Sequence, residues 1–337
     1  MRVVRTDREL ELSRVDMALQ EAGHEVVLLP DAVGEDALCD AVGEADLLLM
    51  CYTPVTARVI TAAKRLRGIV KYGVGIDAID MPAAMARGIP VVNIPAYADN
   101  TVAEGAFALM LALARRLPGL GRQMQAEGWA WPAPRWLGRD IARSTVGVVG
   151  LGRIGRAFAR MAGAGFGARV LGHDPHVSDH ICAEAGVTRC TDLHAMLGDC
   201  DFVSLHCVLN DETRGLIGAP ELGAMKPTAI LINTARGALV DEAALIRALD
   251  EGWIGGAGLD VFRDEPLTRR GHALSALYGR DTVILTPHLS FWTEAALERL
   301  ETETLARCRE ILEGRPVRVN SDDPRLRAQR AGVRFPE

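Results

Sequence analysis

Short apolar runs alternate with amphipathic helical patterns along most of the chain. In the first hundred residues the apolar runs predict strands, and the patterns between them predict helices. Strands are expected at residues 3–4, 24–29, 45–51, 68–72 and 90–93, and helices at residues 8–22, 36–42, 56–63 and 82–86. Strands that alternate with helices form parallel sheets with helices on both faces. This part of the chain therefore predicts a small, complete α/β domain.

The same alternation resumes at residue 145 and predicts a second α/β sheet. Strands are expected at residues 146–149, 168–173, 186–189, 202–205, 229–233, 256–261 and 282–285, with helices at 156–163, 178–185, 192–198 and 242–250. Asp241 and Gly252 are a typical start and stop for the last of these helices. The sequence thus predicts two parallel-sheet domains, separated near a plausible hinge at Pro95.

A long helix is expected between the two sheets. It begins at Thr101, which has the capping-box spacing to Glu104, and ends before Pro118. Residues 124–139 follow, with three tryptophans and no helical or strand periodicity. We favour an arm that covers a neighbouring subunit over a loop packed on its own domain.

The C-terminal part predicts one more helix, over residues 293–313, which ends at Gly314. A return strand is expected at residues 315–320, and the polar tail beyond Ser321 is expected to be extended. We expect this helix and strand to complete the first domain.

Composition excludes several classes of protein. The 337 residues suggest two domains, and 49% hydrophobic with 24% charged residues is typical of a protein with a core. A net charge of −6 argues against a nucleic-acid surface. The N-terminus lacks the apolar core of a signal peptide, and no apolar run is long enough to span a membrane. The seven cysteines are scattered, so we expect reduced thiols, a cytoplasmic protein and no metal site.

The segment from Thr145 to Asp174 carries the clearest motif. A strand leads into Gly150, Gly152 and Gly155, a helical stretch follows, and a second strand ends at Asp174. This is the order of a dinucleotide-binding βαβ unit, with phosphates at the helix N-terminus. Asp174 lies 174 − 155 = 19 positions after the third glycine, close to the spacing of the acid that holds the ribose hydroxyls. The segment therefore predicts a bound dinucleotide.

Three loops that directly follow predicted strands carry polar groups of complementary types. Arg236 offers a planar fork suited to a carboxylate, although an arginine can also be a surface residue. An acid before proline, as at Glu265, is usually only solvated, and a lone histidine such as His288 is more often structural than catalytic. Hydride transfer at an alcohol carbon nevertheless needs a proton acceptor, and histidine titrates in the right range. A neighbouring carboxylate would raise the pKa of that histidine.

The ordered set of motifs resembles the D-isomer-specific 2-hydroxyacid dehydrogenases. The similar segments, which cover nearly all of the chain, are Lys71–Asp80, Gly88–Pro95, Val102–Glu104, Gly150–Asp174, Asn233–Gly237, Gly258–Pro266 and Thr286–His288. The resemblance implies an NAD-dependent enzyme that interconverts a 2-keto acid and a D-2-hydroxy acid. It also implies two Rossmann-like or flavodoxin-like domains with the active site in the cleft between them. The expected substrate-binding domain is 1–98 plus 292–337, and the expected NAD-binding domain is 99–291.

The resemblance also implies roles for individual residues. Arg236 would bind the substrate carboxylate, His288 would be the general acid or base, and Glu265 would orient the imidazole. Backbone amides of Val74 and Gly75 would complete the carboxylate site. The residues expected around the cofactor are Gly150, Gly152, Arg153, Ile154, Gly155, Asp174, Cys207, Thr213, Ala235 and Asp260. Asp174 without an adjacent Arg or Lys implies NAD, because its charge would repel a 2′-phosphate.

The sequence departs from the family pattern in places that leave the substrate open. Val208 and Asn210 replace the usual Pro and Thr of the loop after Cys207, which could loosen it. Lys71, a candidate substrate contact, favours the phosphoglycerate dehydrogenase branch, whereas the aromatic segment up to Trp292 favours the D-lactate dehydrogenase branch and its related NAD-sensing corepressors. An NAD-sensing protein and a phosphite-type dehydrogenase stay alternatives. The long helix and the tryptophan segment resemble dimer-forming elements, so we expect a homodimer.

Overall fold

The computed structural model describes residues 1–336, which form two compact units. The first unit holds Met1–Ala98 and the segment that begins at Thr293, and the second unit holds Asp99–Trp292. Trp292, which we assigned to the first domain from the sequence, thus belongs to the second unit. Each unit contains one large parallel sheet, and this confirms the predicted α/β fold class.

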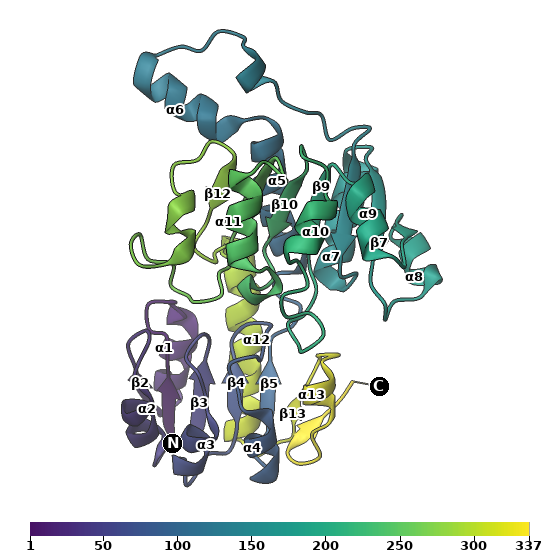
Figure 1. Ribbon diagram of the computed structural model, residues 1–337. Helices are drawn as coiled ribbons and strands as arrows, with labels where there is room; N and C mark the ends of the chain where they lie inside the picture. Colours follow the sequence, from purple (N-terminus) through teal and green to yellow (C-terminus); the bar gives the residue numbers. More distant parts are fainter. Residues whose placement is uncertain (337) are drawn as a thin grey trace. The chain divides into compact units, whose positions relative to one another are not determined.

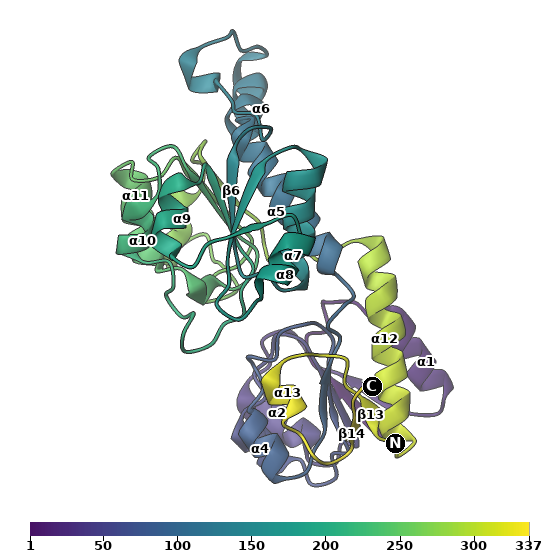
Figure 2. The same ribbon diagram turned by 90° about the vertical axis from the view of Figure 1, so that its right-hand side faces the viewer.

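The sheet of the first unit has five parallel strands in the order β2-β1-β3-β4-β5. The strands are β1 (Arg2–Arg5), β2 (Glu25–Leu28), β3 (Leu47–Met50), β4 (Ile69–Lys71) and β5 (Val91–Asn93). Figure 2 shows helices on both faces of this sheet. On one face lie α1 (Ser13–Glu21) and α12 (Glu294–Leu312), and on the other lie α2 (Glu35–Val42), α3 (Ala57–Ala62) and α4 (Met81–Ala86).

The sheet of the second unit has seven parallel strands in the order β12-β11-β10-β9-β6-β7-β8. They are β6 (Thr145–Val149), β7 (Arg169–His173), β8 (Thr188–Arg189), β9 (Phe202–Leu205), β10 (Ile230–Asn233), β11 (Gly256–Leu259) and β12 (Val283–Leu285). Helices α5 (Asp99–Ala114), α7 (Arg153–Arg160) and α8 (Asp179–Glu184) cover one face. The other face carries α9 (Leu193–Asp199), α10 (Ala219–Ala224) and α11 (Glu242–Asp250).

The helices around residue 116 differ from the prediction. The first helix, α5, begins at Asp99, so Thr101 lies inside it and is not its N-cap. Helix α5 ends at Ala114, before Pro118 as predicted, but after the left-handed residue Arg116 a second helix, α6 (Leu117–Glu127), begins that was not predicted. Proline is tolerated in a first helical turn, where its missing N–H has no partner to lose. The predicted irregular segment therefore starts only after Glu127.

Helix α6 and the segment after it project from the sheet of the second unit (Figure 1). The indole rings of Trp129 and Trp131 meet edge to face, and both side chains are exposed. Leu117 and Leu137 are exposed as well. Such a concentration of exposed apolar side chains is typical of a surface that another molecule covers.

We predicted an extended C-terminal tail, but the tail contains a short helix and a paired strand. Strand β13 (Val317–Arg318) pairs in parallel with β14 (Val333–Arg334), and a short helix, α13 (Pro324–Arg327), lies between them. The side chain of Gln329 accepts from the amide of Val91 and donates to its carbonyl, so the tail is attached to strand β5. Among the described residues, no helix is long and apolar enough to cross a membrane.

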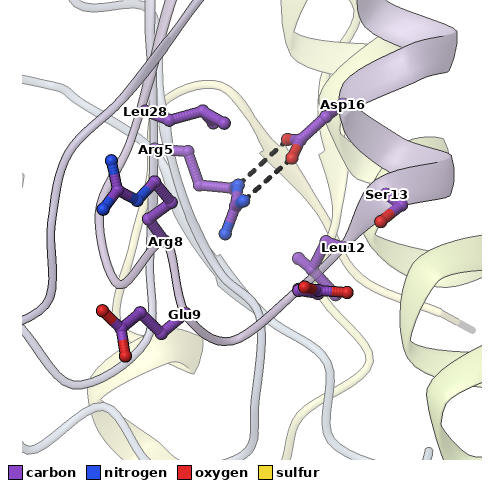
Figure 3. Close-up of a pocket in the computed structure, with 8 residues that line it drawn as sticks. Arg5, Arg8, Glu9, Leu12, Ser13, Asp16 and Leu28 are labelled. Atoms are coloured by element: carbon purple, nitrogen blue, oxygen red, sulfur yellow. Dashed lines mark hydrogen bonds and ion pairs between the residues drawn. The ribbon is translucent and has the colours of Figure 1, made fainter.

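The buried guanidinium of Arg5 joins the end of β1 to helix α1. Its Nε and Nη2 donate to the two carboxylate oxygens of Asp16 at 2.9 and 2.8 Å (Figure 3). Its Nη1 donates to the carbonyl of Leu10 at 3.0 Å. The pair borders a surface pocket of about 580 Å³, which Arg8 and Glu9 also line. None of the site residues predicted from the sequence lines this pocket. We therefore interpret the Arg5–Asp16 pair as structural.

Replacing Asp16 by Ala should strongly destabilise the protein. Arg5 is only 2% exposed, so the variant would leave a buried charge without its carboxylate, which costs about 3 kcal/mol or more. Urea denaturation measures the free energy of unfolding. The control is Asp36→Ala, which removes an ion pair to Arg58 on the exposed surface and should change stability little. Equal stability of the two variants would contradict a structural role for Asp16.

Candidate active site

The glycine turn lies where the strand order of the second sheet reverses. Strand β6 has β7 on one side and β9 on the other. The chain adds β7 and β8 on the first side and then crosses to β9 on the other side, from which β10, β11 and β12 continue. Ligands of open parallel sheets bind at such a point, outside the carboxyl ends of the strands. The loops that meet there begin at Gly150, after β6, and at His206, after β9.

The geometry of the three glycines leaves room for a phosphate at one of them. Gly150 has a φ of 90°, and a Cβ there would lie 2.5 Å from the amide nitrogen of Cys207. A Cβ on Gly155 would lie 2.0 Å from the carbonyl oxygen of Gly150. A Cβ on Gly152, in contrast, would meet no atom within 4 Å, and Gly152 is the N-cap of α7. Open space in front of free helical N–H groups fits a dinucleotide pyrophosphate.

Asp174 and Arg153 border this turn. The carboxylate of Asp174 accepts from the amide of Leu151 at 2.8 Å and from the amide of His176 at 2.9 Å, so the acid is fixed beside the glycines. The guanidinium of Arg153, in the first turn of α7, lies 3.3 Å from the carboxylate of Asp99. Burial raises the pKa of Asp99, and the charges of Arg153 and Arg156 oppose that effect only in part.

The loop after β9 forms a wall beside the turn. His206 packs against Phe158 of α7, with ring centroids 5.0 Å apart, and its Nε2 lies 2.9 Å from the hydroxyl of Ser204. Burial lowers the pKa of His206 to about 3, so the imidazole is neutral at physiological pH. Burial likewise raises the pKa of the Cys207 thiol to about 12. This wall therefore carries no charge towards the turn.

The loop that carries the departures at Val208 and Asn210 is closed by hydrogen bonds of its own side chains. The side-chain oxygen of Asn210 accepts from the amides of Glu212 and Thr213, both at 3.0 Å. The hydroxyl of Thr213 donates to the carbonyl of Val208 at 2.6 Å. These bonds close a compact turn, while Val208 is an exposed apolar side chain. The hydroxyl of Thr213, a predicted cofactor contact, is thus engaged by its own loop.

The loop after β10 positions Arg236. The amide of Ala235 donates to the side chain of Asn233 at 3.0 Å, and the same side chain donates to the carbonyl of Arg236 at 2.9 Å. A Cβ on Gly237 would lie 1.9 Å from the backbone of Phe262, so this loop packs directly on the segment that leads to Glu265. The guanidinium of Arg236 is close enough to lower the pKa of Glu265.

Thr234, in the same loop, was missed by the sequence analysis. Its hydroxyl oxygen is buried and has no hydrogen-bond partner within the described residues. A buried hydroxyl without a partner is costly, and a polar group of a bound ligand would satisfy it. The signal available in the sequence was its place between Asn233 and Arg236, directly after a buried strand.

The structure brings Glu265 and His288 together. The carboxylate Oε2 of Glu265 lies 2.7 Å from Nδ1 of His288, and its Oε1 accepts from the amide of Phe262 at 2.9 Å. Burial raises the pKa of Glu265, but the hydrogen bond and charge of His288, the Phe262 amide and the charge of Arg236 together outweigh burial and lower it. Glu265 is therefore an anion that faces an imidazole.

Asp260 holds the loop that carries His288. The buried carboxylate accepts from the hydroxyl of Thr286 at 2.6 Å and from the amides of Leu289 and Ser290 at 3.1 and 2.9 Å. His288 itself has a φ of 56°, which is unfavourable for a residue with a side chain and is found mostly where the surroundings impose it. We predicted Asp260 as a cofactor contact, and the structure shows that its carboxylate also holds the histidine loop. A contact with the cofactor stays a prediction.

The predicted substrate residues of the first unit lie at and after the end of β4. Lys71 is buried, and its amine donates to the carbonyl of Cys51 at 2.5 Å. Val74 is exposed, and its carbonyl accepts from the side chain of Asn93 at 2.6 Å. Their contact with a substrate, like that of Gly75, stays a prediction. No group of three His, Cys, Asp or Glu side chains in residues 1–336 is arranged to hold a metal ion.

The chain matches the model of one protein family. Residues 107–290, which carry all of the second unit's predicted site residues, match the D-isomer specific 2-hydroxyacid dehydrogenase NAD-binding domain. The chain is 43% identical over 254 residues to a glyoxylate reductase of Korarchaeum cryptofilum, covering 74% of this chain and 75% of that protein. It is 39% identical over 295 residues to a D-3-phosphoglycerate dehydrogenase of Synechocystis, covering 87% of this chain and 52% of that protein.

The chain thus spans about half the length of the phosphoglycerate dehydrogenases that it matches. Among solved structures, it is similar to D-lactate dehydrogenase from Aquifex aeolicus in complex with NAD and lactic acid. That similarity has a TM-score of 0.82 and 32% sequence identity, and it covers 93% of this chain and 96% of the other.

Stability should fall in mild acid because of His206. The unfolded histidine has a pKa of about 6.5, so below that pH the unfolded chain binds a proton that the folded chain does not. The stabilisation is complete above pH 6.5 and is lost progressively towards pH 3, reaching a loss of about 2 kcal/mol at pH 5. His206→Gln should lack this loss when urea denaturation at pH 7 is compared with pH 5.

The matched control is His180→Gln, since the side chain of His180 is 81% exposed. This variant should keep the acid sensitivity of the parent chain. If His206→Gln lost as much stability as the parent between the two pH values, the buried neutral state of His206 would be refuted.

Proposed function

The chain belongs to the D-isomer specific 2-hydroxyacid dehydrogenase family, and we propose that it interconverts a 2-keto acid and a D-2-hydroxy acid with NAD. The observation that supports this activity most directly is the 2.7 Å contact between Glu265 and Nδ1 of His288, beside Arg236. An acid–base pair and a cation, placed at the strand ends of a dinucleotide-binding sheet, are the groups that such a reaction needs.

Each of the three side chains has a separate role in the proposal. With Nδ1 held by Glu265, Nε2 of His288 is the atom that we assign to proton transfer. It gives a proton to the keto oxygen during reduction and removes one from the hydroxyl during oxidation. The anionic Glu265 stabilises the protonated imidazole and fixes its orientation. The guanidinium of Arg236 binds the substrate carboxylate and polarises the keto oxygen.

The nicotinamide cofactor supplies the hydride donor or acceptor when it is bound. Gly152 and the N-terminus of α7 are the groups we assign to the pyrophosphate, and the Thr234 hydroxyl is an additional candidate contact. Asp174 is fixed beside the turn by the amide of Leu151, where its charge suits ribose hydroxyls and opposes a phosphate. We therefore propose that Asp174 selects NAD.

The substrate side chain and the assembly are open parts of the proposal. Lys71 and the aromatic residues after His288 favour different branches of the family. Phe291 packs edge to face on both His288 and Trp292, so an apolar surface borders the proposed general acid. The exposed apolar residues of α6 and the segment after it support a homodimer. Proton transfer by His288 does not depend on either point.

Arg236→Ala and His288→Ala should each lower turnover by at least about a hundredfold, the scale of a lost acid–base or electrostatic contribution. The assay follows NADH absorbance with glyoxylate, pyruvate, phenylpyruvate and 3-phosphohydroxypyruvate. Arg247→Ala, which removes an exposed guanidinium stacked on Trp253, and His180→Gln are matched controls that should keep normal rates. Turnover near the parent rate in either site variant would remove that residue from the mechanism. An inactive parent chain across the panel would favour an NAD-sensing protein or a phosphite-type dehydrogenase.

Asp174→Ala should relax the preference for NAD over NADP. The variant removes the charge that repels a 2′-phosphate and also the hydrogen-bond acceptor for the ribose, so binding of NADH should weaken while that of NADPH improves. Fluorescence titration measures both affinities without turnover. Asp179→Ala, which removes a neighbouring exposed acid paired with Arg189, is the control. An unchanged affinity ratio in Asp174→Ala would show that another residue sets the preference.

A further inference from the structure

Lys71 and Cys51 place an amine against a thiol at the carboxyl end of the first sheet. Strands β3 and β4 are parallel neighbours, and Met50 is the register partner of Lys71. Cys51 follows Met50 directly, so the two side chains extend from adjacent strand ends. Nζ of Lys71 lies 3.1 Å from Sγ of Cys51 and 2.5 Å from its carbonyl oxygen. Both residues are only 6% exposed.

The surroundings hold these two atoms in contact. The thiol of Cys51 donates to the carbonyl of Tyr72 at 3.4 Å, and the sulfur accepts from the amine of Lys71. The ring of Tyr52 lies 5.5 Å from Nζ. A Cβ on Gly73 would lie 3.0 Å from Nζ and 3.8 Å from Sγ, so glycine at that position leaves the amine its space. Because the sheet register fixes both strand ends, Nζ and Sγ do not depend on a mobile loop to meet.

We propose that peroxide converts this pair into a covalent Cys51–Lys71 cross-link. In the first step, Sγ attacks one peroxide oxygen, the O–O bond breaks, and a sulfenic acid and one water form. In the second step, the Nζ lone pair attacks sulfur, the S–O bond breaks, and the hydroxyl leaves with an amine proton as water. Thiol, amine and one hydrogen peroxide thus give an S–N bond and two waters. Sulfur loses two electrons, and peroxide gains them.

Distance and chemistry favour this outcome over the alternatives for a sulfenic acid. A separation of 3.1 Å is within the range of 3–3.5 Å at which reacting atoms are already placed for attack. Sulfenic acids condense with a nearby thiol or with a backbone nitrogen, and here the neighbouring nucleophile is an amine. If a second peroxide takes part, thiol, amine and two peroxides give an S–O–N bridge and three waters. Either product joins the same two residues.

The position of the lysine is specific in this chain. Lysine occurs at three positions only, 64, 71 and 226, and the other basic residues are arginines. Lys64 lies beside Glu44 at the exposed surface, and Lys226 pairs with Asp201 at 3.0 Å. A guanidinium would supply the same charge beside Cys51, but it lacks the nucleophilic amine nitrogen that the condensation needs. Lys71 is the lysine whose amine contacts a sulfur in the described structure.

The cross-link forms independently of the proposed function, but its effect on activity rests on that function. It ties β3 to β4 and changes the amine beside Gly73, where the loop assigned to the substrate carboxylate begins. Displacement of that loop by even an ångström is enough to lower kcat/KM by about tenfold or more. The loss should be reversed by a thiol reductant, because a thiol attacks the cross-linked sulfur and releases the amine.

The test is peptide mass spectrometry of the full-length protein after treatment with hydrogen peroxide. Free thiols are alkylated in denaturant, and trypsin does not cleave after a modified lysine. The expected product joins the peptide of residues 15–58 to the uncleaved peptide of residues 68–87. The S–N product has the summed mass of the two peptides minus two hydrogens. The S–O–N product has that mass plus one oxygen. Dithiothreitol should release both peptides. Fragmentation must place the bond on Cys51, because Cys39 lies in the same peptide.

Matched variants make the result decisive. Cys39→Ser should keep the linked peptide, whereas Cys51→Ser and Lys71→Arg should each abolish it, and circular dichroism checks that every variant is folded. Cys51→Ser should also keep its kcat/KM under peroxide while the parent falls. The proposal is overturned if Cys51 stays alkylatable after the half-buried thiols of Cys39, Cys190 and Cys207 are oxidised. It is equally overturned if Cys51 is recovered only as sulfinic acid with normal cleavage after Lys71. Because the linked peptide is detected without substrate, an inactive parent chain would count against the proposed function alone.

Discussion

The candidate site depends on one buried carboxylate, that of Asp260 at the end of β11. Its two oxygens accept from the Thr286 hydroxyl and from the amides of Leu289 and Ser290. These three groups flank His288, whose left-handed backbone would be unfavourable without them. The clamp turns the imidazole towards Glu265 at 2.7 Å. An acid with no proposed part in proton transfer therefore sets the geometry of the groups that have one.

The first unit uses the same physical device at its own strand ends. The buried carboxylate of Asp7 accepts from the amides of Cys51, Tyr52 and Thr53 and from the Thr53 hydroxyl. It thereby gives hydrogen-bond acceptors to three backbone amides, which lie where the strand order of the first sheet reverses. In each unit, an internal carboxylate organises a loop at the carboxyl edge of the sheet. In the first unit the organised loop carries the thiol that contacts Lys71.

The charged side chains of the second unit's site lie at the glycine turn and near His288, and the start of the loop after β9 between them is neutral. The wall beside the glycine turn is neutral, because burial keeps His206 unprotonated and Cys207 as a thiol. The charged groups of the second unit's site are instead Asp174 and Arg153 beside the turn, and Arg236 with Glu265 near His288. In the proposed complex, the helix N-terminus and Arg153 would be the groups that balance the charge of a pyrophosphate. The ionic groups of the acid–base cluster then act on one another and on the proposed substrate.

By itself, the sequence determined the features that follow from local rules. Alternating apolar runs indicated two parallel sheets, and the spacing of Gly150, Gly152 and Gly155 indicated the dinucleotide turn, because turn and helix-cap chemistry acts within a few residues. Similarity of the ordered motifs singled out Arg236, Glu265 and His288. The helix beginning at Leu117 was missed, because it depends on one left-handed residue, Arg116, that no local pattern predicted.

Only the tertiary structure decided which distant groups meet. The contact of Asp260 with the cofactor stays a prediction, but the fold also brings this carboxylate to the histidine loop, whose bonded groups lie 26 to 30 positions further along the chain. The contact of Lys71 with a substrate stays a prediction, whereas its contact with Cys51 follows from the register of β3 with β4 and was not expected from the sequence. The unpartnered hydroxyl of Thr234 also became visible only in three dimensions. These outcomes depend on strand order and register, which pair residues far apart in the chain and leave no local trace in the sequence.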